Sequence, residues 1–394
     1  KVNYDFFLNL PEIDRTKLER IDIRTSQLIT PLFEYSGACS GCGETPYIKL
    51  LTQLYGDRML IANATGCSSI YGGNLPSTPY TTDANGRGPA WANSLFEDNA
   101  EFGLGFRLTV DQHRVRVMRL LEQFADNIPA ELNDALHAEA TPEVRREQVA
   151  ALRQHLKDVE GAQQLLTDAD ALVEKSIWLI GGDGWAYDIG FGGLDHVLSL
   201  TENVNILVLD TQCYSNTGGQ ASKATPLGAV TKFGEHGKRK ARKDLGVSMM
   251  MYGHVYVAQI SLGAQLNQTV KAIQEAEAYP GPSLIIAYSP CEEHGYDLAL
   301  SHDQMRQLTA TGFWPLYRFD PRRANEGKLP LALDSRPPSD ALAETLLNEQ
   351  RFRRLNAQQP EVAEQLWKDA TADLQKRYDF LAQLAGKAEK SGAE

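Results

Sequence analysis

Four short apolar runs constrain the fold of this chain more than any other feature. They are rich in the Val, Ile and Leu that buried strands favour, and they lie at 177–180, 205–209, 255–258 and 283–287. Helical segments such as 264–278 separate some of the runs. Strands that alternate with helices predict an α/β fold with a doubly wound, mostly parallel sheet.

The composition changes along the chain and suggests three segments. Residues 1–35 show no clear period and are expected to form an N-terminal arm. The α/β domain is expected over 36–330, and within it 111–175 is rich in Glu, Ala, Leu, Gln and Arg, with apolar residues at the spacing of a helical insertion. The composition of 331–394 predicts a tail of peripheral helices outside the core.

Small and polar residues dominate between Ser36 and Gly105. One helix, near 46–55, and one short strand, 59–62, are the regular elements predicted there, and Gly, Ser, Thr, Asn and Cys fill most of the remainder. Loop-rich stretches of this composition usually wrap a ligand.

The overall charge narrows the range of partners. A net charge of -12 repels nucleic-acid phosphates, so no nucleic-acid partner is expected. The chain shows no charged-then-apolar leader and no apolar run near the ~20 residues of a membrane span, which favours a cytoplasmic protein without a membrane partner. Because the chain starts at Lys1 and its first residues look internal, we expect it to be part of a longer polypeptide.

Two predicted strands run directly into loops of ligand-type residues. One enters the Gly-Gly-Asp-Gly-Trp sequence at 181–185, and the other enters Asp-Thr-Gln-Cys-Tyr-Ser-Asn-Thr-Gly-Gly at 210–219. Since the carboxyl ends of parallel strands form a ligand crevice, the loops predict a diphosphate site there. Magnesium would bridge the charge, with the Asp183 carboxylate, the Thr211 hydroxyl and a loop carbonyl as oxygen ligands.

The five cysteines are too few for a disulfide framework. Cys39 and Cys42 form a doublet with a two-residue spacer, whereas Cys67 and Cys291 each follow a predicted strand. Four thiolates hold either a tetrahedral zinc ion or an iron-sulfur cluster. One doublet with two distant single cysteines favours the cluster, and the Cys213 side chain is interpreted as a small buried hydrophobe.

Several long motifs resemble the C-terminal part of the pyruvate:ferredoxin (or flavodoxin) oxidoreductases. The Gly-Asp-Gly start and the later Asn-containing loop also resemble the diphosphate-binding signature of thiamine-diphosphate enzymes. The resemblance covers roughly residues 1–330 and is carried by Phe-Glu-Tyr-Ser-Gly-Ala-Cys-Ser-Gly-Cys-Gly-Glu-Thr-Pro at 33–46, by Ala-Thr-Gly-Cys-Ser-Ser-Ile-Tyr-Gly-Gly-Asn at 64–74, by 88–103 and by 214–220.

The resemblance implies a role for each matching residue. Thr211, together with Asp183 and the Cys213 carbonyl, would hold Mg²⁺, although many relatives carry Asn at that position. The thiolates implied to bind a four-iron, four-sulfur (4Fe-4S) cluster are Cys39, Cys42, Cys67 and Cys291. Residues implied to contact thiamine diphosphate or substrate, with Asn216 catalytic, are Glu44, Cys67, Phe96, Gly182, Asp183, Gly184, Trp185, Thr211, Gln212, Cys213, Tyr214, Ser215 and Asn216.

The implied reaction is the oxidative decarboxylation of pyruvate to acetyl-CoA and CO₂. Electrons would pass one at a time from a thiamine adduct through 4Fe-4S clusters to ferredoxin or flavodoxin, with coenzyme A as co-substrate. The resemblance also implies a homodimer whose remaining polypeptide supplies pyrimidine-binding and ferredoxin-like domains, so this chain alone should show negligible turnover. Alternatives are the same chemistry on another 2-oxoacid, a non-redox thiamine enzyme and a zinc-stabilised interaction module without catalysis.

A basic run at Lys238–Lys243 has two interpretations of similar weight. It would attract an acidic ferredoxin or the phosphates of coenzyme A, or it is a solvated loop. His294, close to Cys291, is expected to have a structural role rather than to tune a cluster.

Overall fold

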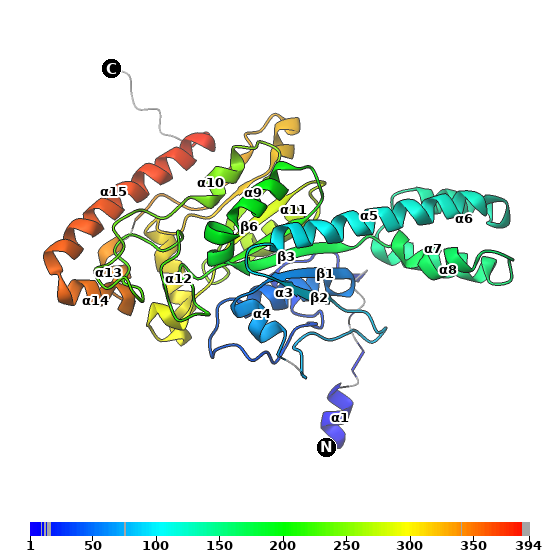
Figure 1. The fold of residues 1–394 in the computed structure, drawn as a ribbon, viewed down its shortest axis with the longest axis horizontal. Coiled ribbons are helices and arrows are strands. Elements are labelled where there is room, and N and C mark those ends of the chain that lie inside the picture. The colour runs from blue at the N-terminus through cyan, green and yellow to red at the C-terminus, as the bar shows by residue number, and fades with distance from the viewer. Residues whose placement is uncertain (9, 12, 14–16, 75, 340, 388–394) are drawn as a thin grey trace.

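The protein is described here by a computed structural model that covers residues 1–8, 10–11, 13, 17–74, 76–339 and 341–387. One sheet with helices on both faces forms its centre (Figure 1). The strands follow the order β2-β1-β3-β4-β6-β5-β7-β8. Their bounds are β1 Met59–Ala64, β2 Ala90–Ser94, β3 Ser176–Gly182, β4 Asn205–Asp210, β5 Tyr256–Ile260, β6 Ser283–Tyr288, β7 Tyr317–Phe319 and β8 Leu331–Leu333.

The pairing of the strands confirms the predicted doubly wound, mostly parallel sheet. All neighbours from β2 to β5 pair in parallel, whereas β7 and β8 add two antiparallel strands at one edge. The sequence did not reveal β2, β7 and β8. Two of them have three residues each, and β2 is partly exposed and lacks a continuous apolar run.

Both faces of the sheet are buried, which explains why the central strands are apolar throughout. In β3, Ile177 and Leu179 belong to one hydrophobic cluster, whereas Trp178 and Ile180 belong to the cluster on the opposite face. The first cluster includes side chains of α9 (Phe191–Ser199) and α10 (Leu245–Met250), and the second includes those of α3 (Thr45–Tyr55), α4 (Cys67–Gly72) and α11 (Leu266–Glu277).

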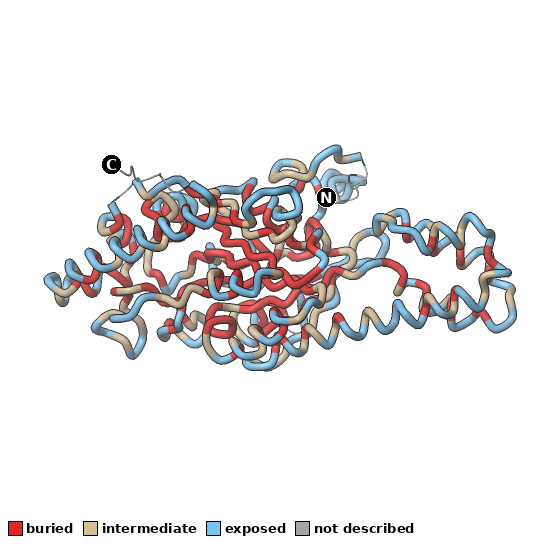
Figure 2. The backbone as a smooth tube through the Cα atoms, turned by 90° about the horizontal axis from the view of Figure 1, so that it is seen from above, coloured by how far each residue is buried: buried red, intermediate tan, exposed pale blue. Residues whose placement is uncertain are grey.

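Four helices form an arm that projects away from the sheet (Figures 1 and 2). They are α5 (Asn99–Gln123), α6 (Ala130–His137), α7 (Pro142–Leu156) and α8 (Gln163–Asp168), and they enclose a hydrophobic cluster of their own. Helix α5 begins well before residue 111, where the helical pattern becomes clear in the sequence. Its first turns carry Gly103 because the helix packs directly on β3, and a Cβ there would lie 2.2 Å from Leu179 Cγ.

The C-terminal helices are α12 (Ser301–Ala310), α13 (Leu342–Leu346), α14 (Gln350–Gln358) and α15 (Pro360–Leu384). The expectation that the tail helices lie outside the core is wrong, because α13, α14 and α15 all bury side chains in the cluster on one face of the sheet, and α14 does so most completely. Its Phe352 and Leu355 are fully buried in the same cluster as one face of the sheet. Apolar side chains at helical spacing on a charged helix allow this packing.

Two short helices precede the sheet, α1 (Val2–Leu8) and α2 (Ile23–Ser26). Asp22 caps α2 by accepting hydrogen bonds from the backbone of Arg24 and Thr25. Within the described part of the chain, no helix combines the length and the apolar composition that crossing a membrane requires.

Candidate functional site

A cavity of about 390 Å³ lies where β1, β3 and β4 end. The loop after each of these strands contributes to its wall, as expected for the carboxyl edge of a parallel sheet. The lining residues are Glu44, Thr65, Gly66, Cys67, Ser68, Phe96, Gly182, Asp183, Gly184, Trp185, Cys213, Tyr214, Ser215, Asn216 and Thr217.

The cavity brings together most residues that the sequence singled out for a cofactor. Thr211 and Gln212 are the exceptions, since both are buried within the second loop and do not line the cavity. Thr65, Gly66 and Ser68, which the sequence-based prediction did not include, line the cavity with Cys67. The 64–74 motif was the signal that could have included them.

Three oxygen atoms that the sequence proposed as magnesium ligands lie together. Thr211 Oγ1 is 3.0 Å from Asp183 Oδ1 and 3.1 Å from the Cys213 carbonyl oxygen. Burial raises the pKa of Asp183, and the negative charge of nearby Asp210 raises it further. Hard oxygen donors around a buried carboxylate fit a divalent cation such as Mg²⁺. The positive charge of the cation would offset the free-energy cost of keeping the Asp183 carboxylate ionised in a buried site.

Glycine at 184 allows two aromatic rings to close over the first loop. A Cβ on Gly184 would lie 2.6 Å from Tyr214 Cε1 and 3.2 Å from Phe96 Cζ. The two rings are neighbours, with centroids 5.9 Å apart. Residues Gly184–Ile189 form a π-helical turn, a local geometry that is frequent at functional sites. The backbone and the rings therefore form a cradle that a larger residue at 184 would fill.

Three segments of the chain bring four of the cysteines together. The backbone N–H of Cys42 donates to the Cys39 carbonyl oxygen at 3.0 Å. The backbone N–H of Gly43 donates to the Pro290 carbonyl oxygen at 2.9 Å. The second bond ties the cysteine doublet to the residue before Cys291. The thiol of Cys67 lies 3.3 Å from Ser215 Oγ, on the side of the second cofactor loop.

The thiols influence one another electrostatically. Burial raises the pKa of Cys42 to about 12, and the Cys291 thiol contributes to the rise. The pKa values of Cys39 and Cys67 are also raised, mainly by burial and in addition by the nearby Cys291 thiol. Cysteine thiolates are the ligands that iron-sulfur clusters use, so these segments carry residues of the right chemistry for one. Among the described residues, no three His, Cys, Asp or Glu side chains are close enough to hold one metal ion.

Cys213 has a contact that the sequence did not indicate. Its thiol is buried, and the neighbouring Cys291 thiol is the largest cause that raises the pKa of Cys213. The fifth cysteine therefore lies directly beside the predicted cluster ligands. Its position in the chain gave no signal of that contact.

Glu44 is a buried carboxyl group in the wall of the cavity. Burial raises the pKa of this group to about 7, although a hydrogen bond of 2.9 Å from the Tyr71 hydroxyl partly opposes the shift. Since the group titrates near neutral pH, it can hold or release a proton under physiological conditions.

Three residues that the sequence did not assign to the site support its loops. Ser222 Oγ donates a short hydrogen bond to Asp183 Oδ2, and Thr225 Oγ1 donates to the Gln212 carbonyl at 2.7 Å. His294 Nε2 lies 2.7 Å from the Thr211 carbonyl oxygen, which is consistent with the structural role expected for it. No sequence motif marked these contacts, because they join segments far apart in the chain.

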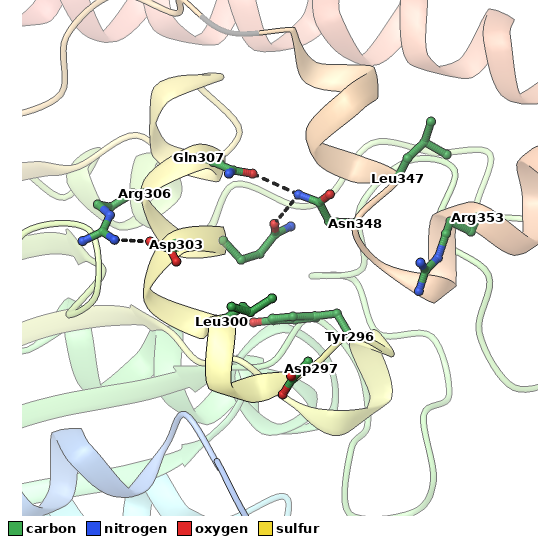
Figure 3. Close-up of a pocket in the computed structure, with 10 residues that line it drawn as sticks. Tyr296, Asp297, Leu300, Asp303, Arg306, Gln307, Leu347, Asn348 and Arg353 are labelled. Carbon is green, nitrogen blue, oxygen red and sulfur yellow. Dashed lines mark hydrogen bonds and ion pairs between the residues drawn. The ribbon is translucent and has the colours of Figure 1, made fainter.

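A second cavity of about 580 Å³ lies between α12 and the start of the tail helices (Figure 3). Asn348 Nδ2 donates hydrogen bonds of 2.9 Å to the side-chain oxygens of Gln304 and Gln307, on the α12 side of the cavity. These polar groups satisfy one another, so this cavity offers fewer free ligand groups than the one at the sheet edge.

Comparisons with known proteins identify similar families and structures. Residues 161–287 match the family model "Thiamine pyrophosphate enzyme, C-terminal TPP binding domain". This range contains both loops that line the cavity at the ends of β3 and β4. A solved structure, 2-oxoglutarate:ferredoxin oxidoreductase from Magnetococcus marinus, matches at 14% identity with a TM-score of 0.42, covering 74% of this chain and 82% of that chain.

Curated relatives match the chain from end to end. A probable pyruvate-flavodoxin oxidoreductase of Escherichia coli is 93% identical over 100% of this chain. A pyruvate-flavodoxin oxidoreductase of Rhodospirillum rubrum is 56% identical, again over 100% of this chain. The match spans 34% of each relative. Over its whole length, the chain is therefore homologous to one segment, about a third, of the pyruvate-flavodoxin oxidoreductases.

Proposed function

We propose that this chain provides the thiamine-diphosphate site and one 4Fe-4S centre of an enzyme that oxidatively decarboxylates pyruvate. One observation carries the proposal: the loops with the magnesium-type oxygen donors and the loop with Cys67 open into the same cavity. The names of the curated relatives support the choice of pyruvate as the 2-oxoacid. The products are acetyl-CoA and CO₂, with coenzyme A as co-substrate.

The proposal divides the chemistry between cofactors and chain. When bound, thiamine diphosphate supplies a nucleophilic carbon and an electron sink for the 2-oxoacid, and an iron-sulfur cluster accepts single electrons. Asp183, Thr211 and the Cys213 carbonyl hold Mg²⁺ against the diphosphate. The backbone at Gly182 leaves room for close approach of the phosphate groups, since the nearest atom to a Cβ there would be the Leu209 carbonyl oxygen at 3.9 Å.

The remaining cavity residues orient the substrate and limit the access of water. The Asn216 amide offers hydrogen-bond donors to an oxygen of the 2-oxoacid, where negative charge develops during the reaction. Phe96 and Tyr214 cover one side of the cavity with aromatic surface. Glu44 is placed to exchange a proton near neutral pH.

Cys67 couples the two parts of the site. It lines the cavity and contacts Ser215 of the second cofactor loop. Cys39, Cys42, Cys67 and Cys291 would hold the cluster, which would supply a one-electron acceptor that shares Cys67 with the cavity wall.

The partners in this proposal lie outside the chain. Flavodoxin or ferredoxin accepts the electrons in the cytoplasm, and the segments that make up the other two thirds of the relatives provide the pyrimidine-binding and ferredoxin-like domains. The whole enzyme is proposed to be a homodimer. The chain alone is proposed to have negligible turnover because its described residues form one α/β sheet, whereas the pyrimidine-binding domain is proposed to lie in the rest of the polypeptide.

The test is the anaerobic visible spectrum of the chain with iron, sulfide and zinc analysis. We expect broad brown absorbance with about four iron and four sulfide per chain, lost in Cys39→Ala. The matched control is Cys213→Ala, which removes a neighbouring thiol outside the proposed ligand set and should keep the absorbance. A colourless protein with stoichiometric zinc would refute the electron-transfer role.

A further inference from the structure

The basic run Lys238–Lys243 directs most of its positive charge inward. Lys238 and Arg242 are partly buried, and Lys243 Nζ lies 2.8 Å from the centre of the Phe191 ring. Arg239 and Lys240 are exposed. A segment that appears in the sequence as a continuous basic patch therefore presents only two of its cations fully to solvent.

Lys238 Nζ caps the turn at residues 222–225. It donates to the carbonyl oxygens of Ser222 at 3.0 Å, Lys223 at 3.3 Å and Thr225 at 2.6 Å. An ammonium group has three donors, so this turn uses all of them. The backbone of Lys238 adds two hydrogen bonds, from Gly228 N at 2.8 Å and to the Ala229 carbonyl at 3.0 Å.

The turn at residues 222–225 contacts both loops of the cavity. Ser222 Oγ donates to the carboxylate of Asp183, and Thr225 Oγ1 donates to the carbonyl of Gln212, between the other two oxygen donors of the site. Within the turn, Ser222 N donates to Thr225 Oγ1 at 2.9 Å. A displacement of the turn would therefore change the positions of both loops together.

Arg242 contacts the end of β4, where the second loop begins. Its guanidinium donates to Asp210 Oδ2 at 2.8 Å and packs over the Trp314 ring, with Cζ 4.8 Å from the ring centroid. Asp210 is fully buried, and it directly precedes Thr211. Arg242 thereby compensates a second buried negative charge next to Asp183.

From these contacts we propose that Lys238 and Arg242 are positioning residues for the magnesium and diphosphate ligands, not a docking surface for an acidic electron carrier. The inference rests on the proposed function, because the site that the two residues support is the thiamine-diphosphate site. It assigns the basic run an internal role that neither of the two sequence-based interpretations included.

The experiment measures binding of Mg²⁺ and thiamine diphosphate by calorimetry in the whole polypeptide that carries this chain. Lys238→Met should raise the Mg²⁺ concentration for half-saturation by about 10-fold or more, the effect typical of lost residues behind metal ligands. Lys240→Met removes an exposed charge of the same run and should bind as the wild type does. The unfolding midpoint without cofactor checks that each variant is folded, and Thr225→Val replaces Lys238→Met if that variant does not fold.

The salt dependence of flavodoxin reduction separates the two roles of the run. Wild-type affinity in both Lys238→Met and Thr225→Val would overturn the inference, and so would a loss of salt-dependent flavodoxin reduction in Lys238→Met at unchanged cofactor affinity. If the wild type itself binds no thiamine diphosphate, the proposed function fails first, and the inference fails with it.

Discussion

Replacing Arg351 in α14 should destabilise the cofactor loop through a buried charge. Arg351 Nε lies 2.6 Å from Glu349 Oε2, and its second nitrogen donates to Gln212 Oε1 at 2.8 Å. Glu349 is 0% exposed, so Arg351→Met would leave its carboxylate unpaired apart from one hydrogen bond from Gln304. Breaking a buried pair costs about 3–5 kcal/mol, and the lost bond to Gln212 adds about 1 kcal/mol.

Urea unfolding of the chain would measure the total loss, expected at about 4–6 kcal/mol. The double variant Glu349→Gln/Arg351→Met removes the unpaired charge and should recover about 2 kcal/mol or more. Arg354→Met is the matched control, since Arg354 is exposed on the same helix. Hydrogen exchange should also increase around Gln212, whose φ of 61° the contact helps to maintain. A loss below about 1 kcal/mol, or no recovery in the double variant, would refute the reasoning.

Three further changes have defined outcomes. Gly103→Ala should lower the free energy of unfolding in urea by about 1–3 kcal/mol, because its Cβ would overlap β3. Gly105→Ala, with open space around it, should not destabilise the protein. Equal effects of the two changes would contradict the packing of α5 on β3. Gly184→Ala should lower thiamine-diphosphate affinity by about 10-fold or more in calorimetry, because the new methyl displaces Tyr214; unchanged affinity would exclude the cradle. Burial and a nearby arginine lower the pKa of His294 below 6.5, so the unfolded state alone takes up the proton and stability falls below that pH. His294→Gln should flatten this slope by up to about 1.4 kcal/mol per pH unit in urea titrations, and an unchanged slope would assign the pH dependence to other groups.

The strands that could be predicted from the sequence are those buried on both faces. Their apolar runs are nearly continuous because both faces pack against hydrophobic clusters, as residues 177–180 and 206–209 show. The partly exposed β2 lacks such a run and was missed. The loops at the ends of β3 and β4 could be predicted because they are contiguous motifs that follow buried strands.

The supports behind the site could not be predicted in the same way. Ser222, Thr225 and Arg351 act through contacts with residues up to 139 positions away in the chain, and no local pattern encodes such a partner. The role of the basic run Lys238–Lys243 could not be predicted for the same reason. The sequence shows that most of its six residues are positively charged. It does not show where each side chain points, because that direction depends on the carbonyl and carboxylate groups that the fold brings close.

Helix α5 connects the arm to the cavity without a break in its backbone. At 25 residues it is a rigid rod of about 37 Å, with its first turn on the sheet and its last turns in the hydrophobic cluster of the arm. Asn99, at its start, donates to the Ala62 carbonyl and accepts from Ser94 Oγ, two residues before Phe96. One continuous helix therefore joins the hydrophobic cluster of the arm to the segment that carries the aromatic wall of the site.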